Sequence, residues 1–184
     1  QRLLYWPMLK SGDFAMMPQL FDFFNRLLET ARLRAHFYFA VDGAHYPEQI
    51  GIYGLCPTCD HGWGNTTGLP VPQIRYHFSS QLEIALMILE YAEYTGADIG
   101  VYIDFIESVV TFYDGFYPQN DGRGKMILEP ANALETFHPV RNPIDAVAGL
   151  DCLLTRMLAL PAHYAPPERK AEWQRILERV PPIA

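Results

Sequence analysis

The chain has 184 residues, 49% of them hydrophobic and 19% charged, which is typical of a single globular domain and excludes an intrinsically disordered chain. The formal net charge is −7 and there is no run of Lys or Arg residues. The sequence therefore disfavours a nucleic-acid partner, because phosphate binding requires a clustered basic surface. No stretch approaches the roughly 20 apolar residues of a membrane-spanning helix, so we expect no membrane partner.

Apolar side chains recur at helical spacing in two segments of the first half of the chain. The first segment is residues 18–35, with apolar positions at Phe24, Leu27, Leu28 and Ala31. The second segment is residues 79–94, which we expect to begin at a Ser79 or Ser80 N-cap and to stop at Thr95-Gly96. This second helix is apolar nearly all round, and a helix of that kind is buried on most sides.

Three further helices are predicted in the second half of the chain. The first carries an apolar stripe formed by Ile99, Ile103, Ile106 and Val110. The next begins after Asn142-Pro143, and the last runs from Pro166-Pro167-Glu168 to a stop at Pro181-Pro182. Strand pattern is scarce, apart from residues 125–128, which can be extended. The sequence thus predicts an all-α fold built from consecutive helical hairpins.

Two connections between these helices are longer than a small bundle requires. Residues 37–78 are rich in Gly, Pro and aromatic residues, and residues 118–143 contain Glu129 and Glu135. A long loop inside a compact domain argues either for function or against the helix assignment. Its rings can be stacking platforms for sugar faces or lids over a core. The loops favour an inner layer of helices surrounded by an outer layer over an up-and-down bundle.

Cysteines and a sequon bear on cofactors and on the compartment. Cys56 and Cys59 form a CxxC pair followed by His61, but no second pair supplies the four ligands of a structural zinc site. A disulfide or two plain thiols are therefore favoured over zinc or redox chemistry. Asn65-Thr66-Thr67 is a glycosylation sequon, which favours an extracellular, secreted protein. We expect neither a metal nor another cofactor.

Carboxylates lie in both long connections. Glycosidic cleavage needs one carboxylic acid to protonate the leaving oxygen and a second carboxylate to activate water or attack carbon. Asp42 and Glu48 lie in the aromatic loop, and Glu129 and Glu135 lie in the later one. A carboxyl group among rings has its pKa raised, which suits the acid role. Each of these residues can equally be solvated or cap a turn.

Short islands along the chain resemble the (α/α)6-barrel glycoside hydrolases, in particular the inverting α-L-fucosidase family. Tyr5-Trp6-Pro7 is similar to that family's Asn-Tyr-Trp-Pro stretch, with Leu4 in place of the asparagine. The segment Tyr94-Thr95-Gly96-Ala97-Asp98 is similar to the family's Tyr-x-x-Thr-x-Asp segment. The run from Pro130 to Glu135 is similar to its Pro-Ser-x-Ser-Pro-Glu motif, whose glutamate is the general acid.

The resemblance implies a glycoside hydrolase that acts on a carbohydrate with inversion, and Glu135 is its implied acid. It also implies that residues 1–184 are a single partial domain, about half of an (α/α)6 barrel built from helical hairpins. The remainder of the polypeptide would complete the barrel and supply the general base.

Several residues are candidates for binding the sugar. We expect Trp6, Tyr46 and Trp63 to stack on it, His45 and Glu48 to hydrogen-bond its hydroxyls, and Asn132 of the motif to join them. In that motif Ala131 and Ala133 replace serines and Leu134 replaces the proline. These replacements leave a carbohydrate-binding or degenerate barrel without catalysis as an alternative. A helical interaction scaffold, with the aromatic loops as its interface, is the other alternative.

Overall fold

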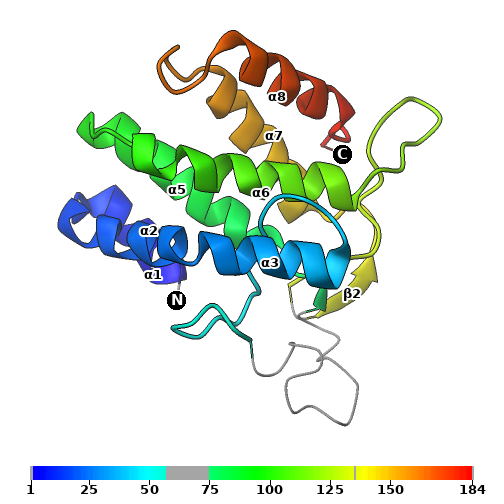
Figure 1. The fold of residues 1–184 in the computed structure, drawn as a ribbon, viewed down its shortest axis with the longest axis horizontal. Coiled ribbons are helices and arrows are strands. Elements are labelled where there is room, and N and C mark those ends of the chain that lie inside the picture. Colours follow the sequence, from blue (N-terminus) through cyan, green and yellow to red (C-terminus); the bar gives the residue numbers. More distant parts are fainter. Residues whose placement is uncertain (1, 57–74, 135, 184) are drawn as a thin grey trace.

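The computed structural model describes residues 2–56, 75–134 and 136–183, which are mostly helical (Figure 1). In chain order the elements are α1 (Arg2–Ser11), the 3-10 turn η1 (Phe14–Met16), α2 (Met17–Arg26), α3 (Leu28–Phe39), α5 (Ser79–Thr95), the 3-10 turn η2 (Gly100–Tyr102), α6 (Ile103–Phe116), β1 (Ala131–Ala133), β2 (Phe137–Val140), α7 (Ile144–Leu158) and α8 (Pro167–Arg179). The expected all-α class is confirmed for these residues apart from one small hairpin, whereas closure into a barrel stays a prediction. Within the described ranges, no helix has both the length and the apolar character that crossing a membrane requires.

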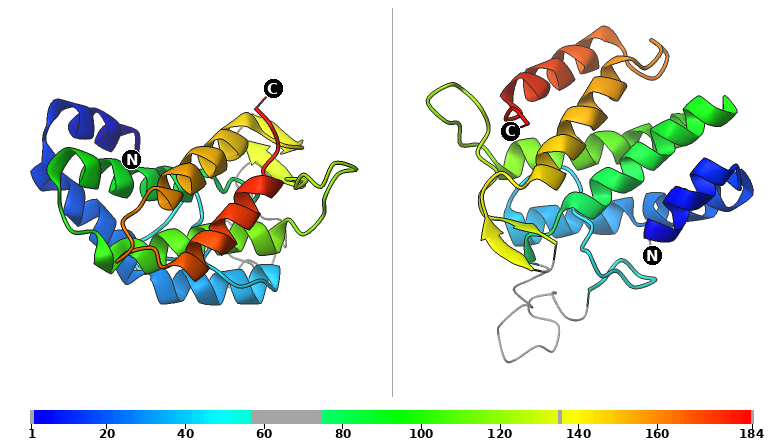
Figure 2. Two further views of the ribbon diagram at one scale, coloured as in Figure 1. Left: turned by 90° about the horizontal axis from the view of Figure 1, so that it is seen from above. Right: turned by 180° about the vertical axis from the view of Figure 1, so that it is seen from behind.

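Helices α5 and α6 run through the middle of the molecule, with α1, α2 and α3 on one side and α7 and α8 on the other (Figures 1 and 2). Helix α5 packs against α1, α6 and α7, and α7 packs in turn against α8. Apolar residues on nearly every side of α5 are buried, as its pattern predicted. Gly149 of α7 faces Leu82 of α5, and a Cβ there would lie 2.9 Å from Leu82 Cδ1. The missing side chain therefore lets these two helices approach closely.

The single helix predicted over residues 18–35 is wrong in detail, because the structure divides it into α2 and α3. Leu27 leaves helical geometry with φ −90° and ψ 4°, and its N–H bonds to the Phe24 carbonyl in a tight turn. No glycine or proline marks this break in the sequence. Helix α3 then continues to Phe39, four residues beyond the predicted end, and stops at Ala40 in the left-handed conformation.

One helix and one cap also differ from the sequence prediction. Helix α1 was not predicted, and it accommodates Pro7 within its ten residues. The expected Ser79 or Ser80 N-cap of α5 is also wrong, because Phe78 occupies the cap position and no side chain caps the helix. The Ser80 hydroxyl bonds to Glu48 instead. The predicted stop is confirmed, since Gly96 follows α5 with φ 68°.

Strands β1 and β2 form an antiparallel hairpin that the sequence analysis did not predict. Ala131 pairs with Val140 and Ala133 with Phe137, with an irregularity between the two pairs. The stretch expected to be extended contributes one bridge, between Asn120 and Met126. The first strand of the hairpin carries the motif that resembles the acid segment of the glycoside hydrolases.

Candidate functional site

The chain after α3 crosses the beginning of α5 and is held there by backbone hydrogen bonds. Ala44 N–H donates to the Ser108 carbonyl of α6 at 2.8 Å, and His45 N–H donates to the Ala31 carbonyl of α3 at 3.1 Å. Tyr46 N–H donates to Gln81 Oε1 of α5 at 2.9 Å. Three helices therefore fix the segment that carries three of the predicted sugar-binding residues.

His45 is buried in a box of aromatic rings. Its ring centroid lies 4.8 Å from that of Phe39, 5.0 Å from that of Phe78 and 5.2 Å from that of Phe112. Its Nδ1 has no hydrogen-bond partner within the described structure. Burial, with a smaller contribution from Arg34, holds the pKa of His45 well below its usual value. The side chain is therefore neutral, and it is not placed to meet a sugar in this structure.

Tyr46 is also a core residue here. Its hydroxyl donates to the Phe24 carbonyl at 2.9 Å, and its ring packs against the rings of Phe24 and Phe105. Burial raises the pKa of Tyr46 above its usual value. Because the residue is only 1% exposed, it offers no ring face on which a sugar could stack.

Glu48 occupies a polar cluster with Ser80 and His77. The Ser80 hydroxyl donates to Glu48 Oε2, and His77 Nδ1 lies 3.6 Å from the same oxygen. The Glu48 side chain is 15% exposed, whereas that of His77 is 2% exposed. Glu48 is thus a nearly buried carboxylate at the N-terminal end of α5, supported from two positions around the start of that helix.

The motif-bearing hairpin is anchored beside this cluster. Asn132 N–H donates to the Tyr76 carbonyl at 3.1 Å, immediately before His77 in the chain. The Tyr117 hydroxyl donates to the Pro130 carbonyl at 2.9 Å and holds the start of the same segment. Asn132 is buried, at 3% exposure. Glu135 and Trp63 lie outside the described residues.

Trp6 joins the same end of α5 from helix α1. Its indole N–H donates to Glu83 Oε2 at 3.0 Å. Ser80 and Glu83 are three residues apart on α5 and are therefore neighbours on one helix face. Trp6, Glu48 and Asn132 thus gather around the N-terminal end of α5. His77 and Ser80 were missed, because no sequence pattern links them to Glu48 in the preceding loop.

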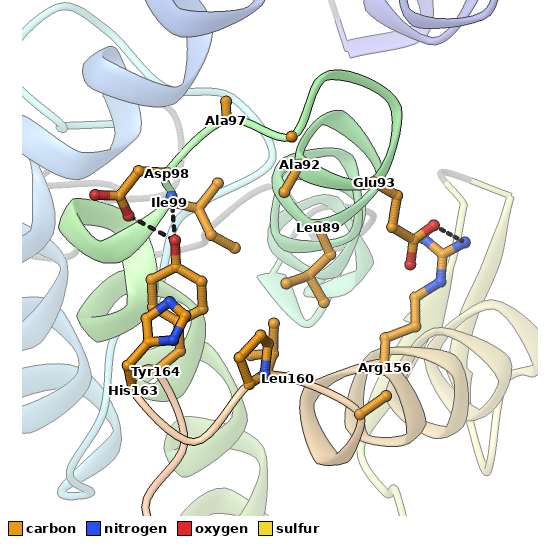
Figure 3. A pocket seen from close by; sticks show the side chains of 13 residues that line it. Leu89, Ala92, Glu93, Ala97, Asp98, Ile99, Arg156, Leu160, His163 and Tyr164 are labelled. Atoms are coloured by element: carbon orange, nitrogen blue, oxygen red, sulfur yellow. Dashed lines mark hydrogen bonds and ion pairs between the residues drawn. The ribbon is translucent and has the colours of Figure 1, made fainter.

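A concavity of about 560 Å³ lies at the opposite, C-terminal end of α5 (Figure 3). Its apolar wall includes Leu89 and Leu160, and its polar rim joins Asp98 to Tyr164 and Glu93 to Arg156. The Tyr164 hydroxyl donates to Asp98 Oδ1 at 2.6 Å. This bond, with a second from the Gly100 N–H, holds the pKa of Asp98 below its usual value. These polar groups of the rim are therefore already paired with one another.

The two ends are well separated. Helix α5 has 17 residues, which corresponds to about 25 Å at 1.5 Å per residue. The concavity therefore cannot share a small ligand with the cluster around Glu48. None of the predicted sugar-binding residues that the structure describes lines it.

The cysteine predictions are resolved in part. Cys56 is disulfide-bonded, so its sulfur is not a thiolate that could bind zinc. Cys152 is a free, exposed thiol. Cys59, His61 and the sequon at residues 65–67 lie outside the described residues. Among the residues that the structure describes, no three His, Cys, Asp or Glu side chains are grouped to hold a metal ion.

Comparisons with known proteins do not assign the chain to a family. No model of a protein family matches it, and no curated protein sequence matches it significantly. A function must therefore be argued from the residues and from the geometry around α5.

Proposed function

We propose that this chain belongs to a glycoside hydrolase that cleaves an oligosaccharide or polysaccharide by general acid and base catalysis with inversion. The supporting observation is the anchoring of β1, the strand of the acid motif, beside the Glu48 cluster through the Asn132–Tyr76 hydrogen bond. Carboxylates and an indole ring at one end of a helical array are the groups that hold and cleave a sugar.

Glu135 is the proposed acid, and its role is to protonate the leaving glycosidic oxygen. An inverting site places its base about 6.5–9.5 Å from the acid, which leaves room for the attacking water. We propose that this base comes from a part of the polypeptide beyond residues 1–184. Glu48 and Asn132 are the proposed partners of sugar hydroxyls, and Trp6 and Trp63 are the proposed stacking residues.

The test is hydrolysis of a panel of aryl glycosides and plant-type oligosaccharides by the intact protein and by Glu135→Gln. The amide cannot donate a proton, so we expect turnover to fall by roughly 100- to 10,000-fold, the usual contribution of a general acid. Sugar binding and folding should persist. Glu129→Gln is the matched control, because Glu129 lies in the same segment but is 56% exposed and near Arg141. Normal turnover by Glu135→Gln would exclude Glu135 as the acid.

A carbohydrate-binding protein without catalysis is the second candidate. It is favoured by Ala131, Ala133 and Leu134, which stand where the resembling motif has two serines and a proline. This candidate predicts that the folded protein binds oligosaccharides and hydrolyses none of the panel. Saturation-transfer NMR with the same oligosaccharides separates it from an interaction scaffold, which would bind none of them.

We also propose that the protein is extracellular. The disulfide at Cys56 supports this, because disulfides persist in oxidising compartments. Alkylation of the native protein without a reductant should label exposed Cys152 and leave Cys56 unmodified. Labelling of Cys56 in freshly purified protein would contradict the proposal.

A further inference from the structure

The imidazole of His77 is an unusual side chain to find at its position. It is 2% exposed, and neither ring nitrogen makes a hydrogen bond within the described structure. A buried polar group without a hydrogen bond loses the solvation that water gave it in the unfolded chain. A phenyl or isobutyl group would fill such a space without that loss. A charged group that explains an imidazole here is the Glu48 carboxylate, 3.6 Å from Nδ1.

Glu48 is equally dependent on its surroundings. A carboxylate that is only 15% exposed has lost much of its hydration and needs hydrogen-bond donors from the protein in its place. The Ser80 hydroxyl is one donor. His77 Nδ1 lies 3.6 Å from the same oxygen, so a protonated Nδ1 would become a second donor after a small shift of the ring. Both supports come from the first turn of α5 and the residues just before it, and both Ser80 and His77 are buried.

We infer that Glu48 is a second functional carboxylate of this site and that His77 and Ser80 are positioning residues that fix its orientation. The inference rests on the proposed function. The ligand class is a neutral sugar with vicinal hydroxyls, because a carboxylate accepts hydrogen bonds from two adjacent O–H groups and would repel an anionic sugar. Asn132 N–H of β1 bonds to the Tyr76 carbonyl, one residue before His77 in the chain, so under the proposed function hydroxyl binding at Glu48 would orient the sugar for cleavage.

The kinetic test compares Glu48→Gln, Ser80→Ala, His77→Phe and His77→Asn on the best neutral substrate of the panel. Loss of the Ser80 hydroxyl in Ser80→Ala, or of the imidazole beside Glu48 in His77→Phe, should lower kcat/KM roughly tenfold. His77→Asn should recover most of this loss, since its amide N–H can replace Nδ1–H. Glu48→Gln should be affected at least as strongly. Tyr164→Phe is the control, because it removes a hydroxyl-to-carboxylate bond at the far end of α5 and should leave kcat/KM unchanged.

A second readout does not depend on hydrolysis. The ¹⁵N NMR shifts of the His77 ring should change in Glu48→Gln and stay constant in Tyr164→Phe, and circular dichroism checks that each variant is folded. Unchanged kcat/KM in folded Ser80→Ala and His77→Phe would overturn the inference while an inactive Glu135→Gln still supported the proposed function. If the wild type hydrolyses nothing, the proposed function fails. The inference is then judged by adding the neutral oligosaccharides, and His77 shifts that do not respond would overturn it.

Discussion

The two ends of α5 differ in how their polar groups are satisfied. At the C-terminal end a concavity of about 560 Å³ is open, yet its rim residues pair as Tyr164 with Asp98 and Arg156 with Glu93. At the N-terminal end, buried nitrogens of His45, His77 and Gln81 lack hydrogen bonds within the described structure. Each buried polar group without a hydrogen bond lowers the free energy of unfolding. A fold therefore retains such groups mainly where function requires them. We therefore base the proposed site on the buried, incompletely hydrogen-bonded groups at the N-terminal end and not on the open concavity at the other end.

At the N-terminal end a loop also packs tightly on a helix. Gly43 has φ 89°, and a Cβ at this position would lie 2.3 Å from Phe112 N and 2.5 Å from the Ser108 carbonyl oxygen. Both are backbone atoms, which cannot rotate away as a side chain can. Glycine is therefore required for the segment that leads to His45, Tyr46 and Glu48 to lie on α6.

Gly43→Ala should destabilise the protein more than any of the other proposed variants. Backbone strain and the clash with α6 together should lower the free energy of unfolding by about 3 kcal/mol or more, as measured by urea denaturation. Gly122→Ala is the control, because nothing lies within 4 Å of its Cβ position, and it should change stability by less than about 0.5 kcal/mol. Equal stabilities of the two variants would show that the loop is not seated on α6 in solution.

His45→Phe should change how stability depends on pH. The pKa of His45 is held well below its unfolded value of 6.5, mainly by burial. Below pH 6.5 the unfolded chain therefore binds a proton that the folded protein does not. The stability that neutral His45 contributes is fully present above pH 6.5. It is lost as the pH falls toward the folded-state pKa, by up to about 1.4 kcal/mol per pH unit for one proton.

The phenylalanine variant keeps the ring in its box and removes this proton. Its free energy of unfolding should therefore fall less steeply than that of the wild type between pH 6.5 and pH 5, in urea titrations at matched ionic strength. The difference between the two curves isolates His45, since every other titrating group is common to both. Parallel curves would mean that His45 is not buried neutral, which would weaken the contrast between the two ends.

Particular residues show what the sequence could and could not predict. Helix α5 was located to within one residue, because its apolar positions and Gly96 are local signals. The break at Leu27 was missed because no residue type there opposes a helix, and α1 was missed although Trp6 within it was singled out. Glu48 was a candidate from its loop alone. His77 and Ser80 were not, because their relation to Glu48 arises only when the loop folds across α5.

Tyr46 and His45 show the opposite failure of the sequence prediction, in which residues proposed for the site are buried in the core. Both have the residue types of a sugar site and lie in an aromatic loop, so the sequence could not separate them from Glu48. Packing against Phe24 and Phe112 made them core residues instead. Aromatic composition therefore could not show which rings of the loop are buried and which face solvent.

The smallest effect expected is that of Tyr164→Phe, at the end of α5 where polar groups are already paired. The Tyr164 hydroxyl is the main cause of the low pKa of Asp98, and the Gly100 N–H is the second. Removing the hydroxyl should raise that pKa part of the way toward its usual value, because the backbone donor remains. A ¹³C NMR titration of the side-chain carboxyl groups measures this, with Asp121 as an internal control whose pKa is lowered mainly by the N–H groups of Lys125 and Arg123. If Tyr164→Phe also reduced sugar binding or hydrolysis, the concavity would have to be part of the functional site, and the distinction between the two ends of α5 would fail.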